Sequence, residues 1–98
     1  MEEFDKQYRA EYYMELKRQE FMELWQGSRT VNEYELAFRE LAEYAPELVS
    51  TEKLKCTRFE QGLRLDIRDR VTILKGTDFQ QVLGQAYRAE QLLNVRHR

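Results

Sequence analysis

The sequence predicts an all-α fold, a compact bundle of about five helices. Apolar residues recur at steps of three and four through most of the chain, which is the spacing of one face of a helix. No segment alternates polar and apolar residues for long enough to form a strand. Only four glycines and one proline occur in 98 residues, and each glycine is expected at a helix boundary. A chain of this length forms one domain at most.

The composition argues against several classes of protein. A hydrophobic share of 42% and an aromatic share of 12% are too high for a disordered chain. A net charge of −2, from 16 basic and 18 acidic residues, argues against a dedicated binder of nucleic acid or membrane surfaces. No apolar run reaches the length of a membrane span, and the N-terminus is unlike a signal peptide. We therefore expect a soluble, cytoplasmic chain that is a segment of a longer protein.

The first 26 residues contain no Gly or Pro and are expected to be helical. A stripe of apolar residues recurs every four positions, at Phe4, Tyr8, Tyr12 and Leu16. A second apolar patch follows at Phe21, Leu24 and Trp25. The stretch is either one long helix or two helices joined by a kink. Gly27 ends it, because glycine is the usual helix stop.

The second helix has a defined start. Thr30 and Glu33 form an S/T-x-x-E capping box, in which each side chain accepts a hydrogen bond from the other residue's backbone amide. An apolar stripe then follows at steps of four, three and four, at Tyr34, Phe38, Leu41 and Ala45. Glu35 and Arg39 are expected to pair across one turn on the outer side. Pro46 ends the helix, because the residue before a proline avoids the α region.

Three further helices complete the prediction. A third is expected to begin at residue 50 or 51 and to run to residue 61, with Gly62 as its C-cap. A fourth is expected over residues 65–75, closed by Gly76, and the last begins at residue 77 or 78. The apolar stripe of the last helix is Phe79, Val82, Leu83, Ala86, Tyr87, Glu90 and Leu93, with Glu90 as its polar member.

The sequence offers no catalytic or metal-binding constellation. His97 is the only histidine, and the Cys–His spacing of a zinc site is absent. Cys56 cannot form an intramolecular disulfide and is expected to be a packed or interfacial thiol. The carboxylates of residues 1–25 alternate with Lys and Arg, as on a solvated helix face, and the arginines of residues 58–70 stand among acidic residues. We therefore expect no enzyme, no cofactor, no metal and no direct binding of nucleic acid.

A series of short motifs resembles the Gag capsid region of gypsy-class long-terminal-repeat retrotransposons. In order they are KRQEF at 17–21, LxQGxxxVxEYxxxFxxL at 24–41, YAP at 44–46, LVSTE at 48–52, RFEQGLR at 58–64, IRDRV at 67–71, Phe79 and AYRAE at 86–90. The resemblance spans residues 17–91, and its strength lies in the ordered set rather than in any one piece. It implies that residues 1–19 are a helix leading in from the preceding capsid lobe. Residues 20–98 would then form a capsid C-terminal-like lobe.

The Gln-Gly turn and the helix after it are similar to the major homology region of retroviral capsids. The resemblance implies that Gln26 and Gly27 form the turn and that the helix packs through buried anchors. The corresponding turn and core residues are Gln26, Gly27, Thr30, Glu33, Tyr34, Phe38 and Leu41. The retroviral pattern also has a glutamate shortly after the glycine and an arginine just before the phenylalanine, where this chain has Thr30 and Ala37. The capping box is expected to order this region instead. Related elements often carry a proline near position 10, where Ala10 permits a longer first helix.

Self-association is the function that the resemblance implies. Retroviral capsid lobes pair through the helix that corresponds to residues 51–61, and a closed two-fold contact is the commonest form of homo-oligomer. The resemblance places the dimer face at Thr51, Leu54, Lys55 and Arg58. The alternative is that Leu54 packs inward beside Phe59.

Two functions remain open at this point. The chain is either a structural lobe that self-associates, contacts other capsid lobes and builds a virus-like particle, or a domesticated interaction module. The SCAN dimerisation domain of vertebrate zinc-finger transcription factors and neuronal Gag-derived proteins are similar to this lobe. A domesticated module would also be compatible with a nuclear location. A shell contact is expected to be weak and to gain through multiplicity, whereas a dedicated dimer persists on dilution.

Overall fold

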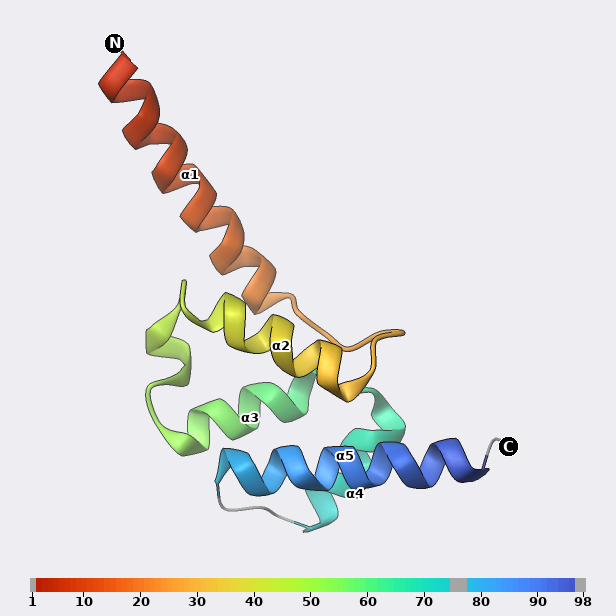
Figure 1. The fold of residues 1–98 in the computed structure, drawn as a ribbon. Coiled ribbons are helices and arrows are strands. Elements are labelled where there is room, and N and C mark those ends of the chain that lie inside the picture. The colour runs from red at the N-terminus through yellow and green to blue at the C-terminus, as the bar shows by residue number, and fades with distance from the viewer. Residues whose placement is uncertain (1, 75–77, 97–98) are drawn as a thin grey trace.

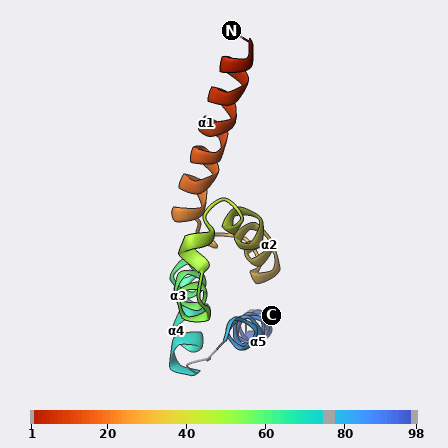
Figure 2. The ribbon, with the colours of Figure 1, turned by 90° about the vertical axis from the view of Figure 1, so that its left-hand side faces the viewer.

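The structure is a computed structural model that describes residues 2–74 and 78–96, with side chains described over residues 9–73 and 78–94. Every regular element in these ranges is a helix, so the predicted all-α fold is confirmed. The elements are α1 (Glu2–Met22), α2 (Val31–Ala42), the 3₁₀ helix η1 (Pro46–Val49), α3 (Glu52–Gly62), α4 (Leu65–Leu74) and α5 (Phe79–Arg96). Helices α2 and α5 form one layer of a lobe and α3 and α4 the other (Figure 2).

Helix α1 is a single unbroken helix that projects from the lobe (Figure 1). It passes the expected boundary after residue 19, and its last turn places Phe21 in the core at 1% exposure. Tyr12 and Leu16 of the predicted stripe are exposed because this part of α1 extends beyond the lobe. The Phe4 and Tyr8 side chains lie outside the described ones. The molecule consequently measures 58 × 30 × 16 Å along its principal axes.

Aromatic rings hold the helices together at the centre of the lobe. The Phe38 ring lies 5.2 Å from Phe21 of α1, 5.3 Å from Phe59 of α3 and 5.7 Å from Phe79 of α5, measured between ring centres. Each such pair contributes about 0.5–1.5 kcal/mol beyond the burial of its area. Phe38 therefore joins α2 to three other helices.

Two predicted glycine positions are wrong. Gly62 is the last residue of α3 rather than its C-cap, and among the described glycines only Gly27 has a positive φ. Position 62 requires a glycine for a different reason, which is space. A β-carbon there would overlap the Tyr34 hydroxyl and lie 3.0 Å from the Leu24 carbonyl oxygen. Gly84 lies inside α5 instead of at a helix boundary. Gly76, the expected end of α4, lies outside the described residues.

Other helix ends agree more closely with the sequence. Helix α2 ends before Pro46, which begins the short η1 turn that the sequence did not predict. Thr51 is the N-cap of α3, and its hydroxyl accepts a hydrogen bond of 3.1 Å from the Leu54 amide. Asp78 precedes α5, and its carboxylate accepts from the Gln81 amide at 2.9 Å. Short polar side chains thus begin both helices.

The buried Tyr34 hydroxyl makes the free energy of unfolding depend on pH in the alkaline range. Tyr34 is 1% exposed and donates a hydrogen bond of 3.0 Å to the Phe59 carbonyl oxygen, and burial raises the pKa of its phenol. Below pH of about 10, the ordinary tyrosine pKa, the group is neutral in both the folded and the unfolded chain. Above it the unfolded chain releases a proton that the folded chain retains, so the free energy of unfolding falls.

We expect Tyr34→Phe to lower the free energy of unfolding by about 1 kcal/mol at pH 7, through the lost hydrogen bond. Between pH 10 and 11 the wild type should lose up to about 1.4 kcal/mol more than the variant, one proton's worth. Urea unfolding at pH 7, 9, 10 and 11 measures both quantities. A difference between the two proteins that stays constant from pH 7 to 11 would contradict this account.

Candidate functional site

One buried polar side chain, Gln26, fixes the turn between α1 and α2. Gln26 is 0% exposed. Its Oε1 accepts a hydrogen bond of 3.0 Å from the Arg64 amide, and its Nε2 donates one of 2.9 Å to the Arg29 carbonyl oxygen. Its own backbone amide donates to the Gly62 carbonyl oxygen at 2.6 Å. The turn is therefore tied to the junction of α3 and α4, 38 residues further along the chain.

The residues on either side of Gln26 adopt the sharp path that this attachment requires. Gly27 has φ +58°, a left-handed conformation that is strained for residues with a side chain. The Trp25 ring lies beside it, and a β-carbon added at Gly27 would be in van der Waals contact with that ring. Arg29 donates through Nη1 to the Trp25 carbonyl oxygen at 2.9 Å. The backbone on both sides of Gln26 is thus hydrogen-bonded within the turn.

The start of α2 is capped from two directions. The predicted capping box is confirmed, because Glu33 Oε1 accepts from the Thr30 amide at 2.9 Å and Thr30 Oγ1 accepts from the Glu33 amide at 3.1 Å. These hydrogen bonds lower the pKa of the Glu33 carboxyl. Glu90 of α5 adds a second carboxylate, whose Oε2 accepts from the Val31 amide at 2.8 Å. Two carboxylates, one from α2 and one from α5, therefore accept hydrogen bonds from the backbone amides at this helix end.

The structure brings together the predicted turn and core residues around this one region. Tyr34 and Phe38 are buried, and Leu41 packs partly buried against the same core. Glu35 is 3% exposed and forms the predicted ion pair with Arg39. Glu35 is therefore more deeply buried than an outer-face pair implies.

The four residues of the predicted dimer face on α3 lie in two different environments. Leu54 is 47% exposed, so it does not pack inward beside Phe59. It borders a groove of about 210 Å³ that Leu48 and Thr57 also line, with Arg58 and Gln61 at its side. Thr51 is exposed at the start of the helix. Leu54 is thus an apolar side chain on a helix face that faces solvent in the single chain.

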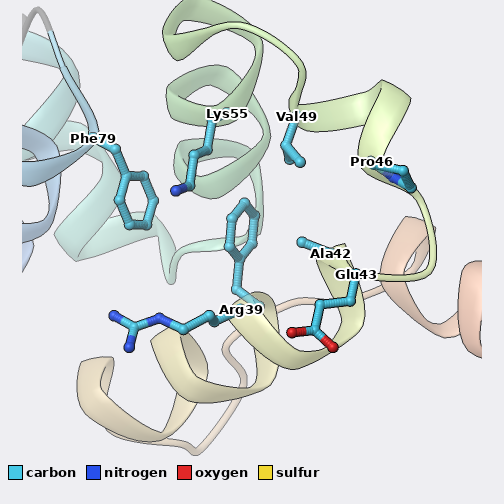
Figure 3. Close-up of a pocket in the computed structure, with 8 residues that line it drawn as sticks. Arg39, Ala42, Glu43, Pro46, Val49, Lys55 and Phe79 are labelled. Atoms are coloured by element: carbon cyan, nitrogen blue, oxygen red, sulfur yellow. The ribbon is translucent and has the colours of Figure 1, made fainter.

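Lys55 and Arg58, the other predicted members of that face, contact aromatic rings of the core. The Lys55 Nζ lies 4.3 Å from the centre of the Phe79 ring, and Figure 3 shows the side chain directed toward that ring. The Arg58 guanidinium carbon lies 5.7 Å from the centre of the Phe21 ring. Cation–π contacts of this kind contribute about 0.5–1 kcal/mol at exposed sites. Both cations therefore help to hold α3 on the lobe.

The pocket that Lys55 enters is apolar and open. It has a volume of about 240 Å³ and lies between α2, η1, α3 and the start of α5, with Phe38, Ala42 and Val49 in its lining (Figure 3). This volume is below the usual range for small-molecule sites, about 300–1,000 Å³. Nearby Cys56 is buried, and burial raises the pKa of its thiol, so the reactive thiolate is disfavoured. The pocket combines an apolar surface with three charged side chains, Arg39, Glu43 and Lys55.

Within the described residues, no group of three or more His, Cys, Asp and Glu side chains is placed to hold a metal ion. His97 lies outside that part of the chain. None of the helices that the structure describes has the length and apolarity needed to cross a membrane. Comparison with known protein families, curated proteins and solved structures finds no match for this chain.

Sequence reasoning missed two carboxylates that join the helices. Glu90 stood out only as a polar member of an apolar stripe, and it caps α2 from 59 residues away. Glu52 does the same for α5, since its Oε2 accepts from the Phe79 amide at 2.9 Å. A glutamate inside an apolar stripe was the available signal for Glu90. Glu52 carried no such signal, because acidic residues are common in the first turn of any helix.

We expect Gln26→Ala to lower the free energy of unfolding by about 3 kcal/mol, because it leaves the Arg64 amide and the Arg29 carbonyl oxygen without their partner. Urea unfolding followed by circular dichroism measures the change. Gln19→Ala is the matched control, since Gln19 is exposed and its side chain donates to the Glu23 carboxylate just beyond the end of α1. Its effect should stay within about 0.5 kcal/mol. Equal effects of the two substitutions would contradict the role assigned to Gln26.

Proposed function

We propose that this chain is a non-enzymatic structural lobe whose function is self-association. In its sharpest form, the proposal is a Gag capsid lobe of a gypsy-class retrotransposon that pairs through α3 and, with other capsid lobes, builds a virus-like particle. The ordered motifs over residues 17–91 support the capsid class. Gln26 is buried and hydrogen-bonded, which gives the Gln-Gly motif of that class a structural role in this chain.

The observation that carries the proposal is the exposed Leu54 beside its groove. Fully burying a leucine side chain contributes about 1.5–3 kcal/mol, and Leu54 leaves part of that contribution unused in the single chain. In a two-fold contact, the Leu54 of a second copy can enter the groove beside the first. One such contact per copy is weak, which suits a shell in which many equal contacts act together.

The charges around Leu54 also fit a contact between like surfaces. Glu47 lies on the groove and pairs with Arg18 of α1, and Arg58 lies on the Phe21 ring. An acidic and a basic side chain, Glu47 and Arg58, thus flank the apolar Leu54. A two-fold axis can place the acidic side chain of one copy against the basic side chain of the other.

We expect the molar mass of the wild-type chain to rise from monomer to dimer across a hundredfold range that includes micromolar concentrations. Leu54→Asp should remain monomeric with unchanged helical circular dichroism, because it places a charge in the contact. Light scattering coupled to size exclusion measures the mass.

Leu36→Asp is the matched control, since Leu36 is also 47% exposed but lies on α2. It should dimerise like the wild type. A wild-type chain that stays monomeric throughout, or a dimer that Leu54→Asp leaves intact, would contradict the proposed interface. A wild-type dimer that never dissociates would favour the dedicated, SCAN-like dimerisation module instead.

A further inference from the structure

A second groove lies on a different part of the lobe from the α3 face. It runs between the end of α1 and the outer side of α2 and has a volume of about 380 Å³. Its apolar members are Leu24, Ala37 and Leu41, and its aromatic member is Trp25. Glu20 and Glu23 bring carboxylates to it. We call this the Trp25 groove.

Trp25 is exposed, yet its backbone is held in place. The side chain is 65% exposed, the highest value among the aromatic residues described as exposed. Its carbonyl oxygen accepts from Arg29, and the next residue is the buried Gln26 with its three hydrogen bonds. An aromatic side chain on a fixed backbone loses little entropy when a partner covers it, and tryptophan is enriched among the residues that dominate binding energy.

Carboxylates outnumber cations around the Trp25 groove. Glu20 lies 3.2 Å from the Lys17 ammonium, and Glu23 accepts one hydrogen bond of 3.0 Å from Gln19. A carboxylate has about four acceptor positions, so each retains capacity for a further donor. Arg29 is the cation of the groove itself.

The adjoining surface adds further negative charge. A neighbouring groove shares Leu41 and adds Glu40 and Glu43, with Lys17 as its cation. The two grooves together therefore bring four carboxylates and two cations, which gives this surface a net charge of −2. Phosphate groups are repelled by such a surface, whereas Lys and Arg side chains are attracted to it.

We propose that the Trp25 groove binds a basic side chain from a partner protein segment that carries apolar residues next to it. The Lys or Arg cation lies on the face of the Trp25 ring and reaches the carboxylates of Glu20 and Glu23. The apolar neighbours cover Leu24 and Leu41. This geometry combines a cation–π contact with charge-assisted hydrogen bonds. The site is separate from Leu54, so it does not rest on the proposed self-association.

Trp25 is the single tryptophan of the chain, so fluorescence excited at a wavelength that tyrosine does not absorb reports on this groove. The chain is titrated with three peptides of equal length, acetyl-LRL-amide, acetyl-LQL-amide and acetyl-LEL-amide, up to millimolar concentration. We expect a saturable change with the arginine peptide, binding about tenfold weaker with the glutamine peptide, and no saturation with the glutamate peptide. Added salt should weaken the binding of the arginine peptide more than that of the other two peptides.

Two double variants locate the binding. Glu20→Gln with Glu23→Gln should weaken the arginine peptide about tenfold and leave the glutamine peptide unchanged. Glu11→Gln with Glu15→Gln removes the same charge from exposed positions of α1 outside the groove and should change nothing. Trp25→Ala should abolish binding measured by calorimetry while the mass distribution of the chain stays that of the wild type.

Three results would overturn the proposal. One is equal binding of the three peptides, and another is full affinity in the Glu20/Glu23 double variant. The third is a change in Trp25 fluorescence with protein concentration alone that peptides do not compete away, which would make a second copy of the chain the occupant. A failure here leaves the Leu54 experiment unaffected, because that experiment measures mass and this one measures peptide binding.

Discussion

The hydrogen bonds of the buried Gln26 side chain are the constraint on which the rest of this structure depends. A buried amide that lost its partners would cost about 1–3 kcal/mol for each unsatisfied group, so the turn, Arg29 and the junction at Arg64 must keep their relative places. Gly27 supplies the left-handed backbone that lets the chain leave Gln26 toward α2. Gly62 supplies the space in which Tyr34 can lie against α3. The hydrogen bonds of this one side chain thus set where α1 ends, where α2 begins and how both meet α3.

Both surfaces that we propose for partners are presented from parts of the lobe that internal contacts hold in place. Trp25 lies one residue before Gln26, so an exposed ring is presented from a fixed backbone rather than from a mobile loop. Leu54 lies on α3, which the Lys55 and Arg58 contacts with Phe79 and Phe21 hold against the lobe. The two surfaces differ in chemistry, because one is acidic and aromatic and the other is a single leucine beside a groove. The two proposals are therefore compatible, because a homotypic partner at Leu54 and a heterotypic partner at Trp25 would not compete.

The sequence predicts what is local and fails where partners are distant. The Thr30–Glu33 capping box and the α2 stripe depend on neighbours three or four residues away, and both are present. Gln26, Glu52 and Glu90 each have a hydrogen-bond partner far along the chain, at 38, 27 and 59 residues, and no local pattern could name these partners. Gly62 looked like a helix stop because its closeness to Tyr34 exists only in three dimensions. Tyr12 and Leu16 show the converse, because an apolar stripe does not tell whether the lobe extends far enough to cover it.

Native-state hydrogen exchange of the Gln26 and Arg64 amides tests the central role of Gln26 most directly. Both N–H groups donate to partners that hold the turn on the α3–α4 junction. If that attachment opens only when the whole lobe unfolds, both amides exchange with the same free energy, and the same urea dependence, as core amides such as that of Phe59. If the two amides instead exchange at the rate of the exposed Ser28 amide, the turn opens independently and Gln26 does not hold the fold together.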